Sequence, residues 1–549
     1  MKIFSATGLF AVVSHWFNAN IISLGREMRL SYMPPLMVYV AAGISGLTGI
    51  VGTFYVKEKL GLSAEFLAML GFWMMLPWAL KMPLGHLVDL MWRWKSLLVY
   101  LGASLIMLSL GIMIGLLGHT EFMASMASIE TWYVVSALLA PIGYVLQDVV
   151  ADAMTVEAVP RVDENGTKLD AQTRKLMHVT MQTLGRVAII GGGILVSVVN
   201  VFLLRDAATL PEDEKEAVYL LVYQLALIIP MVSVLGVMLA SWLRRRNIQQ
   251  LVSQGYSRLE SARLLAIHTE PPPVNWWILG GGLFFTLTSL AVGLSRMPGA
   301  EEVIFLISMS IVLFLMWRLT NELEPEARHV LVGTAFLVFI FRAIPGPGAG
   351  STWWMIDELG FDQQFLAVLS LVGATLTLFG MFIFRRFMAE RSIAYIIGFL
   401  TIAGTFLSLP IIGMYFGLHE WTAALTGGVV DARFIALIDT ALESPLGQIA
   451  MIPMLAWIAN SAPDKLKATF FAVMASFTNL ALSASQLGTK YLNQIYEVTR
   501  EVKDTITGEI VIPADYSELG HLLITVTIIG LVLPVASIVL VKRSRFRNA

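Results

Sequence analysis

The chain contains no cysteine, and only 14% of its 549 residues are charged. The absence of cysteine excludes disulfides, thiol catalysis and thiolate metal sites. Ordinary soluble domains carry roughly 25% charged residues. A chain with 57% hydrophobic residues and a mean hydropathy of +0.74 is therefore not expected to dissolve as a globule. The formal net charge of -2 excludes a strongly basic nucleic-acid-binding protein.

Other chemical signatures are missing as well. The eight histidines are scattered, with no pair at the spacing of metal ligands. No glycine-rich nucleotide loop and no nucleophile–base pair is visible in the sequence. We therefore expect no metal, no cofactor and no enzymatic activity, and transport driven by ATP has no support. Any chemistry has to come from carboxylates, bases, hydroxyls and aromatic side chains.

Apolar runs near twenty residues recur from one end of the chain to the other. Each run is long enough to cross ~30 Å of hydrocarbon. We predict an all-α polytopic membrane protein with about 14 transmembrane helices. The predicted spans are 34–56, 66–84, 96–117, 131–158, 177–204, 218–242, 275–296, 302–318, 329–350, 364–384, 392–416, 429–459, 468–492 and 520–541.

The distribution of basic residues predicts the orientation. With both termini inside, the cytoplasmic segments hold 25 of the 37 lysines and arginines, and the outer segments hold 8. This excess follows the positive-inside rule. We therefore expect both termini in the cytoplasm, and we assign the protein to a bacterial cytoplasmic (inner) membrane. Residues 1–33 are interpreted as an amphipathic arm on the membrane surface, with a cleaved signal peptide as the alternative.

An internal repeat divides the chain. Residues 57–70 align with residues 356–369 at one fixed offset, and both segments lead into a new span. Two copies of a six-helix unit joined by a cytoplasmic linker are how major-facilitator transporters are built, with a central site between the halves. The predicted organisation is an arm at 1–33, a first half at 34–242, a linker at 243–274, an inserted helix pair at 275–318, a second half at 319–541 and a tail at 542–549.

The fourth span contains three acids. Asp148 and Asp152 are four residues apart and share one helix face, whereas Glu157 lies on the opposite face nearer the cytoplasm. Each acid costs about 3 kcal/mol at a helix centre in a bilayer, even on the lower insertion scale. We expect Asp148 and Asp152 to meet a wet cavity, a basic partner or a proton. Two such carboxylates suit a proton carrier, and the alternative is a static charge network that locks helices.

The twelfth span occupies the equivalent place in the second copy. It carries Arg433, and it carries Asp439 and Glu443 four residues apart. Bases also fall inside other predicted spans, namely Lys81, Arg186 and Arg342. Lys81 could extend to the cytoplasmic surface or neutralise an acid, and the two arginines could pair with acids or contact an anionic substrate.

Two further groups of residues are candidates for function. Trp78, Tyr144, Trp353 and Trp354 could stack on a flat ring, although packing or a place at the membrane interface is the commoner role. Gly85, Asp89, Arg93 and Lys95 follow the second span and could form a latch that breaks on opening. The alternative for this second group is an ordinary positive-inside loop.

Proline and glycine interrupt the ninth span. Pro345 and Pro347 lack backbone donors, and Gly346, Gly348 and Gly350 relax the chain. The span is predicted to break near its outer end, where the freed carbonyl groups need a cavity or a protein partner.

Residues 76–89, with Pro77, Trp78, Lys81, Gly85 and Asp89, resemble the Pro-Trp, Lys-Pro, Gly and Asp signature of the folate–biopterin transporter family of the major facilitator superfamily. The acids at 148, 152 and 157 are similar to that family's fourth-helix motif. Residues similar to its second-half pattern are Pro453, Pro463, Ala468, Thr469, Phe471, Ala472, Ser476, Asn479 and Gly488. The chain departs from the pattern at Met82 and Lys467 and in the inserted helix pair. Fourteen helices and the acids also resemble bacterial muropeptide permeases.

The resemblance implies a secondary active transporter that works by alternating access. We expect proton coupling and a small organic anion, such as a pterin or a folate, as substrate. The alternatives are a muropeptide or amphiphile permease and a non-transporting factor that assembles a membrane complex. The expected partners are a small molecule, protons and the lipid bilayer, with no nucleic acid, and the chain is expected to be a monomer.

Overall fold

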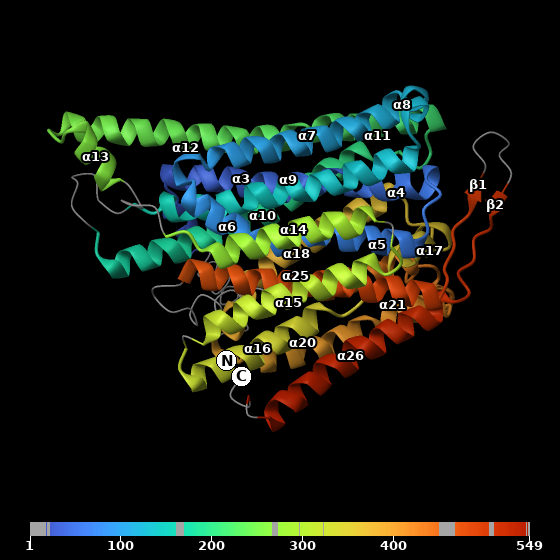
Figure 1. Ribbon diagram of the computed structural model, residues 1–549. Coiled ribbons are helices and arrows are strands. Elements are labelled where there is room, and N and C mark those ends of the chain that lie inside the picture. The colour runs from blue at the N-terminus through green and yellow to red at the C-terminus, as the bar shows by residue number, and fades with distance from the viewer. Residues whose placement is uncertain are drawn as a thin grey trace, which may run out of the picture.

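A computed structural model describes residues 22–160, 169–265, 273–295, 297–321, 323–449, 467–503 and 510–544, together with residues 18 and 546. Helices dominate these residues and run along one common direction, so the molecule is an elongated bundle (Figure 1). Eleven helical segments of this part of the chain are long and apolar enough to cross a membrane. The prediction of a polytopic helical membrane protein is confirmed, whereas the number fourteen is not.

The two ends of the bundle differ. At one end, which we call the hairpin end, strands β1 (Val502–Lys503) and β2 (Ile510–Ile512) form an antiparallel hairpin (Figure 1). At the opposite end, which we call the tail end, lie the last residues of two long helices, α12 (Ile228–Ser253) and α26 (Leu519–Arg543). By the predicted topology, the tail end faces the cytoplasm.

The first half contains six spans, several of them built from two helices. Its elements before α12 are α3 (Met33–Ile44), η3 (Ser45–Thr48), α4 (Gly49–Lys59), α5 (Ala64–Met75), η4 (Leu76–Leu80), α6 (Lys81–Leu90), η5 (Trp92–Trp94), α7 (Ser96–Gly118), α8 (Thr120–Met126), α9 (Ile129–Ala158), α10 (Ala171–Leu203) and α11 (Glu212–Ala226). Short helices α2 (Ser23–Arg26) and η2 (Leu30–Tyr32) precede them. Most of the predicted arm at 1–33 lies outside the described residues.

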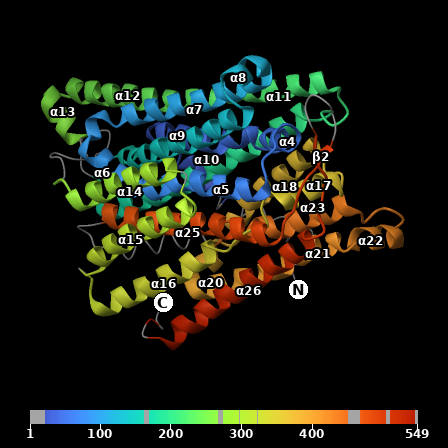
Figure 2. The ribbon, with the colours of Figure 1, turned by 45° about the vertical axis from the view of Figure 1, so that its right-hand side comes forward.

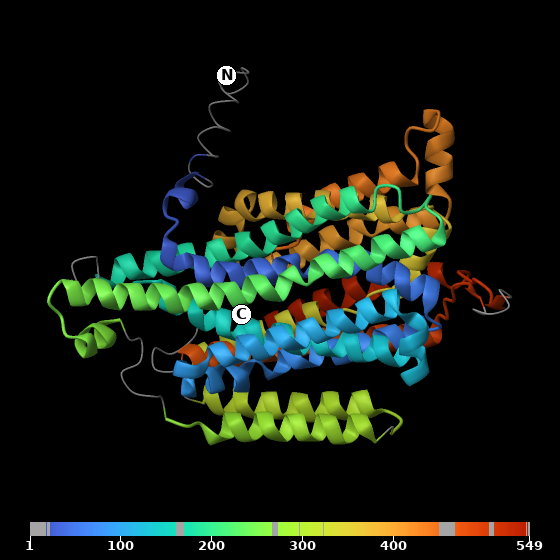
Figure 3. The ribbon, with the colours of Figure 1, turned by 90° about the horizontal axis from the view of Figure 1, so that it is seen from above.

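The inserted pair consists of α14 (Trp276–Leu294) and α15 (Ala300–Thr320), which lie side by side at the edge of the bundle (Figure 3). The predicted linker begins as a continuation of α12 and turns back into α13 (Arg258–Leu264). The helix of the span predicted at 218–242 thus continues as a polar helix for about three turns into the predicted linker, which was expected to begin with helical spacing.

The second half repeats the arrangement with more interruptions (Figure 2). Its elements before β1 are α16 (Pro325–Arg342), α17 (Ala349–Asp357), α18 (Gln363–Ile383), α19 (Arg385–Glu390), α20 (Ile393–Leu407), α21 (Leu409–Tyr415), α22 (Leu418–Thr426), α23 (Ala432–Glu443), η6 (Ser444–Leu446) and α25 (Lys467–Ile495). The span predicted at 429–459 begins as α23, and its part after residue 449 lies outside the described residues.

Local sequence explains where several helices begin. Ser63, Ser128 and Asp362 each accept a hydrogen bond from the backbone amide three residues ahead. These residues are N-caps, which satisfy amide groups that the helix itself leaves unpaired.

The halves meet through two equivalent interfaces. Helix α10 packs along α18, and α25 packs along α5. The repeat makes α18 the counterpart of α5, and α25 holds the same place in the order of its half as α10 does. The contact of α10 with α18 and the contact of α25 with α5 are therefore equivalent under the repeat. At the same offset, the 3-10 turn at 45–48 in the first helix corresponds to residues 344–347.

The predicted break in the ninth span is confirmed. Helix α16 ends at Arg342, and α17 begins at Ala349. Three residues of α25, spaced one helical turn apart, bond the backbone of the break. They are Ser485, which donates to the Ile344 carbonyl (2.7 Å), Thr489, which accepts from the Gly346 amide (2.9 Å), and Asn493, which donates to the Pro347 carbonyl (3.3 Å). The protein partner that a broken span requires is thus α25.

Candidate functional site

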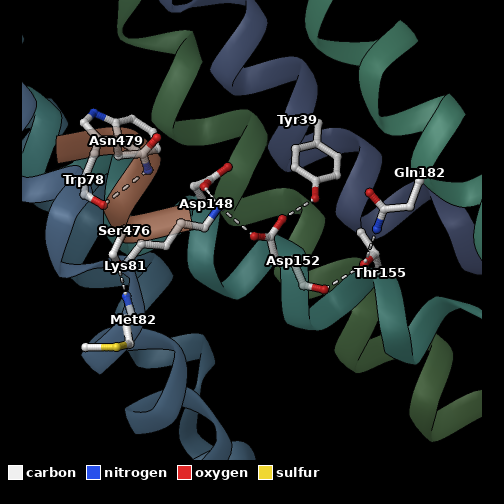
Figure 4. A network of polar contacts seen from close by, with 10 residues as sticks. All are labelled: Tyr39, Trp78, Lys81, Met82, Asp148, Asp152, Thr155, Gln182, Ser476 and Asn479. Atoms are coloured by element: carbon white, nitrogen blue, oxygen red, sulfur yellow. Dashed lines mark hydrogen bonds and ion pairs between the residues drawn. The ribbon is translucent and has the colours of Figure 1, made fainter. Parts of the chain in front are cut away.

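A lysine and two carboxylates meet inside the first half (Figure 4). Lys81 Nζ lies 2.6 Å from Asp148 Oδ2 and 2.7 Å from Asp152 Oδ2. The hydroxyl of Tyr39, from α3, donates to Asp152 Oδ1 at 2.7 Å. We call these four residues the Lys81 cluster. The acids of the fourth span therefore have a basic partner, supplied by the start of α6.

The position of Lys81 depends on a break in the second span. Pro77 stands in the first turn of η4, and the helix resumes as α6 at Lys81 itself. Helix α25 bonds this break too, because Asn479 Nδ2 donates to the Trp78 carbonyl (3.4 Å) and Ser476 Oγ accepts from the Met82 amide (3.1 Å). Ser476 and Asn479 come from the second half. Contacts between the halves therefore flank Lys81 on both sides (Figure 4).

The position of Tyr39 depends on glycine. A Cβ atom at Gly185 of α10 would lie 2.9 Å from Tyr39 Cε2, closer than real Cβ atoms come to other atoms. Further along the same contact, a Cβ at Gly43 would lie 2.2 Å from the Ile189 carbonyl oxygen. Glycine at these positions lets α3 and α10 approach closely. The close approach holds the Tyr39 ring against α10 with its hydroxyl directed at Asp152 (Figure 4).

The cluster lies deep in the bundle but is not sealed. Asp148 is ten residues before the end of α9, which corresponds to about 15 Å of helix. For the span predicted at 131–158, this distance corresponds to about half of a hydrocarbon core of ~30 Å. The Asp152 side chain nevertheless keeps 39% of its surface exposed, against 18% for Lys81. A small ion or molecule can therefore reach Asp152 in this structure.

Two arginines from opposite halves lie near each other, and one of them, Arg186, acts on the cluster. The positive charges of Arg186, from α10, and Arg342, at the end of α16, act on each other across the interface. Arg186 also interacts electrostatically with Asp148. Arginine side chains inside a membrane protein usually face a water-filled cavity or a negatively charged group. The arrangement can therefore hold a negatively charged group between the halves.

Glu157 and the predicted gating loop lie at the tail end. Glu157 bonds Lys95 at 2.6 Å, and Lys95 Nζ lies 4.2 Å from the centre of the Trp92 ring. Gly85 and Asp89 lie in α6, and Arg93 lies in η5. These residues are separate from the Lys81 cluster and link α9 to the start of α7.

The acids and the base of α23 are not brought to the cluster by any contact in the described part of the chain. Arg433 bonds Asp362 and the Gly360 carbonyl, each at 2.8 Å, near the first turn of α23. Asp439 interacts electrostatically with Glu443, and its Oδ1 is buried without a hydrogen-bond partner among the described residues. A pair between Arg342 and Asp439 is not among the contacts of these residues.

The aromatic candidates have packing roles in this structure. Trp353 and Trp354 are buried in α17, and Trp353 lies under the guanidinium of Arg500 at 5.0 Å. Tyr144 packs against the hairpin-end core of the first half, and Trp78 packs against a smaller core near α9. Burial favours the packing interpretation for Trp353 and Trp354, whereas Trp78 and Tyr144 are only half-buried.

Contacts between the halves close the hairpin end. Lys57 of α4 pairs with Asp357 of α17 at 2.5 Å. Gln363 donates to the Tyr219 hydroxyl at 2.8 Å, and Arg500 donates to the Leu60 carbonyl. These bonds join α4, the loop after it and α11 to α17, α18 and the loop after α25. Sequence reasoning missed them, and it missed Tyr39, because nothing in the local pattern marks a partner so distant along the chain. Ser476 and Asn479 were recognisable only as part of a family pattern.

These features define a class of protein. A polytopic helical bundle whose two halves meet through two equivalent interfaces has the architecture of major-facilitator-type membrane transporters. Solved structures are similar. A POT family transporter in complex with 5-aminolevulinic acid has a TM-score of 0.59 and 12% identity, covering 94% of this chain and 96% of that chain. A peptide transporter POT in complex with sulfate has a TM-score of 0.57 and 14% identity, covering 94% of each chain. At this identity the likeness shows the fold alone.

The chain belongs to the BT1 family, whose family model matches residues 42–548. The folate-biopterin transporter of Synechocystis sp. is 24% identical over 86% of this chain and 76% of its own length. A probable folate-biopterin transporter of Arabidopsis thaliana is 25% identical over 28% of this chain and 29% of its own length. The resemblance seen in the sequence is confirmed, and the protein is a membrane transporter rather than an enzyme.

Proposed function

We propose that the protein is a proton-coupled secondary transporter of a small organic anion of the folate or pterin kind. The Synechocystis relative, which matches 86% of this chain, carries folate and biopterin in its name, which supports this substrate class. The observation that carries the proposal is the Lys81 cluster, with one base shared by two carboxylates, beside Arg186 and Arg342.

The charges of the cluster suggest how proton and anion are coupled. One lysine neutralises one carboxylate, so the cluster keeps one negative charge when both acids are ionised. A proton on Asp148 or Asp152 removes that charge. The two arginines then attract an anion with less competition from the carboxylates of the cluster, because opposite charges interact strongly where water is scarce. Proton uptake thereby favours anion binding, which is the coupling that a symporter needs.

Asp152 is the better candidate for the proton site. Its side chain is twice as exposed as that of Asp148, so a proton can reach it. Tyr39 donates to one oxygen of Asp152 and Lys81 to the other, so both carboxylate oxygens are held in place. Protonation of Asp152 would leave Lys81 paired with Asp148 alone.

The movement between states would use the contacts between halves. The bonds at the hairpin end have to break when that end opens, and α25 has to slide or rotate against η4, where it touches the residues on either side of Lys81. A change in the ion pairs of Lys81 can therefore affect the second half directly, because α25 contacts the residues on either side of Lys81. We further propose that the tail end and both termini are cytoplasmic, that the chain works as a monomer, and that its membrane is a bacterial cytoplasmic membrane.

The test is uptake of labelled folate and pterin into proteoliposomes. We expect a pH gradient, acid outside the accumulating compartment, to drive uptake by the wild type. Asp152→Asn should abolish gradient-driven uptake but leave counterflow exchange, because exchange does not require release of the proton. Glu121→Gln, which removes an exposed acid in α8, is the matched control and should behave as the wild type. Unchanged gradient-driven uptake in both Asp148→Asn and Asp152→Asn would exclude the acids from the mechanism.

A further inference from the structure

We propose that the tail end of the first half carries a binding site for the headgroup of an anionic phospholipid. The site lies at the tail end, where Trp92 of η5 and Val237 and Ala240 of α12 pack in one hydrophobic core and α12 leaves its apolar stretch. We call it the arginine–tryptophan patch. Its members are Arg93, Trp94, Trp242, Arg244, Arg245 and Arg246.

Two arginines of the patch lie over exposed tryptophans. The Arg93 guanidinium carbon is 5.9 Å from the centre of the Trp94 ring, and that of Arg246 is 5.5 Å from the Trp242 ring. The tryptophans are 59% and 53% exposed. Exposed indoles at the end of a transmembrane helix lie at the level of the lipid headgroups. The guanidinium groups above them are therefore placed where lipid phosphates are.

Among the residues that the structure describes, no ion pair neutralises the positive charge of the patch. Within the described chain, no ion pair joins a carboxylate to Arg93, Arg244, Arg245 or Arg246. Glu157, an acid of this region, is already bonded to Lys95. Arg244 is close enough to Lys95 for the two positive charges to oppose each other. An anion from outside the chain would relieve this repulsion.

The patch is held on a rigid support. Helix α12 packs along α7 and continues without a break through the three arginines to Ser253. The chain then turns at Gly255, whose φ of 99° suits glycine, and α13 brings Arg258 and Arg263 back to the same end. The bases of this segment are all arginines. A guanidinium binds two phosphate oxygens at once, whereas an ammonium acts as a point charge.

A phospholipid explains these features better than a soluble anion does. A free phosphate needs the charges but not two exposed indoles, and the indoles are suited to the boundary between headgroups and acyl chains. The proposal does not depend on the transported substrate, because the patch is separate from the Lys81 cluster.

Native mass spectrometry of the full chain, released from neutral detergent micelles that contain phosphatidylglycerol or phosphatidylcholine, tests the site. We expect retained phosphatidylglycerol but not phosphatidylcholine on the wild type. An arginine near an anionic lipid surface contributes on the order of fivefold to binding, so Arg244→Gln, Arg245→Gln and Arg246→Gln together should weaken retention about a hundredfold. Arg318→Gln is the matched control. It removes an arginine that lies 4.6 Å over the Trp277 ring, outside the patch, and should retain lipid as the wild type does.

Equal retention of phosphatidylglycerol by the wild type and the triple variant would overturn the proposal. So would equal retention of both lipids by the wild type. If the triple variant does not fold, Arg246→Gln alone should lose about fivefold, and no loss in it would also count against the site. Thermal unfolding with inorganic phosphate separates the two sources of phosphate. A stabilisation by phosphate equal to that by phosphatidylglycerol would assign the patch to a soluble anion instead.

Discussion

Gly185→Ala should disturb the Lys81 cluster without altering any of its members. The new Cβ would lie 2.9 Å from Tyr39 Cε2 and 3.1 Å from Cδ2. Carbon atoms prefer separations of about 3.5 Å or more, so the ring has to move by roughly half an ångström. The Tyr39 hydroxyl then moves away from Asp152, to which it is bonded at 2.7 Å.

Two opposing effects determine how Gly185→Ala changes the free energy of unfolding. Overpacking a tight contact costs about 1–3 kcal/mol, whereas replacing glycine by alanine inside a helix gains up to about 1 kcal/mol. A net loss of roughly 1–2 kcal/mol in the free energy of unfolding is expected. Part of this loss is the weakened bond to a charged carboxylate, since such bonds contribute about 1.5–3 kcal/mol.

Thermal unfolding in detergent and the pH dependence of uptake measure the effect. Gly191→Ala and Gly193→Ala are the matched controls, because both glycines lie in α10 with no atom within 4 Å of the added Cβ. These variants should be neutral or slightly stabilised. Gly185→Ala should instead melt earlier and shift the pH profile of uptake in the direction that Tyr39→Phe does. The double variant should show less than the sum of the two effects, because both act on one bond. If Gly185→Ala behaves like Gly191→Ala in both assays, the argument for Tyr39 is wrong.

Three further outcomes are expected. In a chain without native cysteines, Glu509→Cys should react with a membrane-impermeant thiol reagent only from outside, and labelling only from inside would reverse the topology. Arg342→Lys should weaken binding of anionic substrates but not of neutral analogues, because lysine lacks the bidentate fork; equal losses would leave Arg342 without a role in anion binding. Lys57→Ala and Asp357→Ala should be coupled in a double-mutant cycle by about 0.5–3 kcal/mol, and strictly additive effects would show that their bond does not hold the halves together.

Much of the architecture could be read from the sequence because the bilayer imposes local rules. A span must be apolar over about twenty residues. An acid inside it requires a basic partner, a wet cavity or a proton, and proline together with glycine interrupts the helix. These rules predicted the polytopic fold, the placement of Asp148 and Asp152 on one helix face with a partner, and the break after Arg342. Each depends on residues within one or two helical turns of each other.

Which of the candidate residues meet, and that Tyr39 joins them, was decided by the tertiary structure. The Tyr39–Asp152 bond joins residues 113 apart in the chain, and the Asn479–Trp78 bond joins residues 401 apart. Hydropathy treated Arg433 as buried within a span, but the N-cap at Asp431 starts α23 there and lets Arg433 reach Asp362. The sequence around Trp353 does not distinguish a side chain that lines a cavity from one that fills a core. Which side chains meet depends on how helices of the two halves pack, and that packing is absent from any single stretch of sequence.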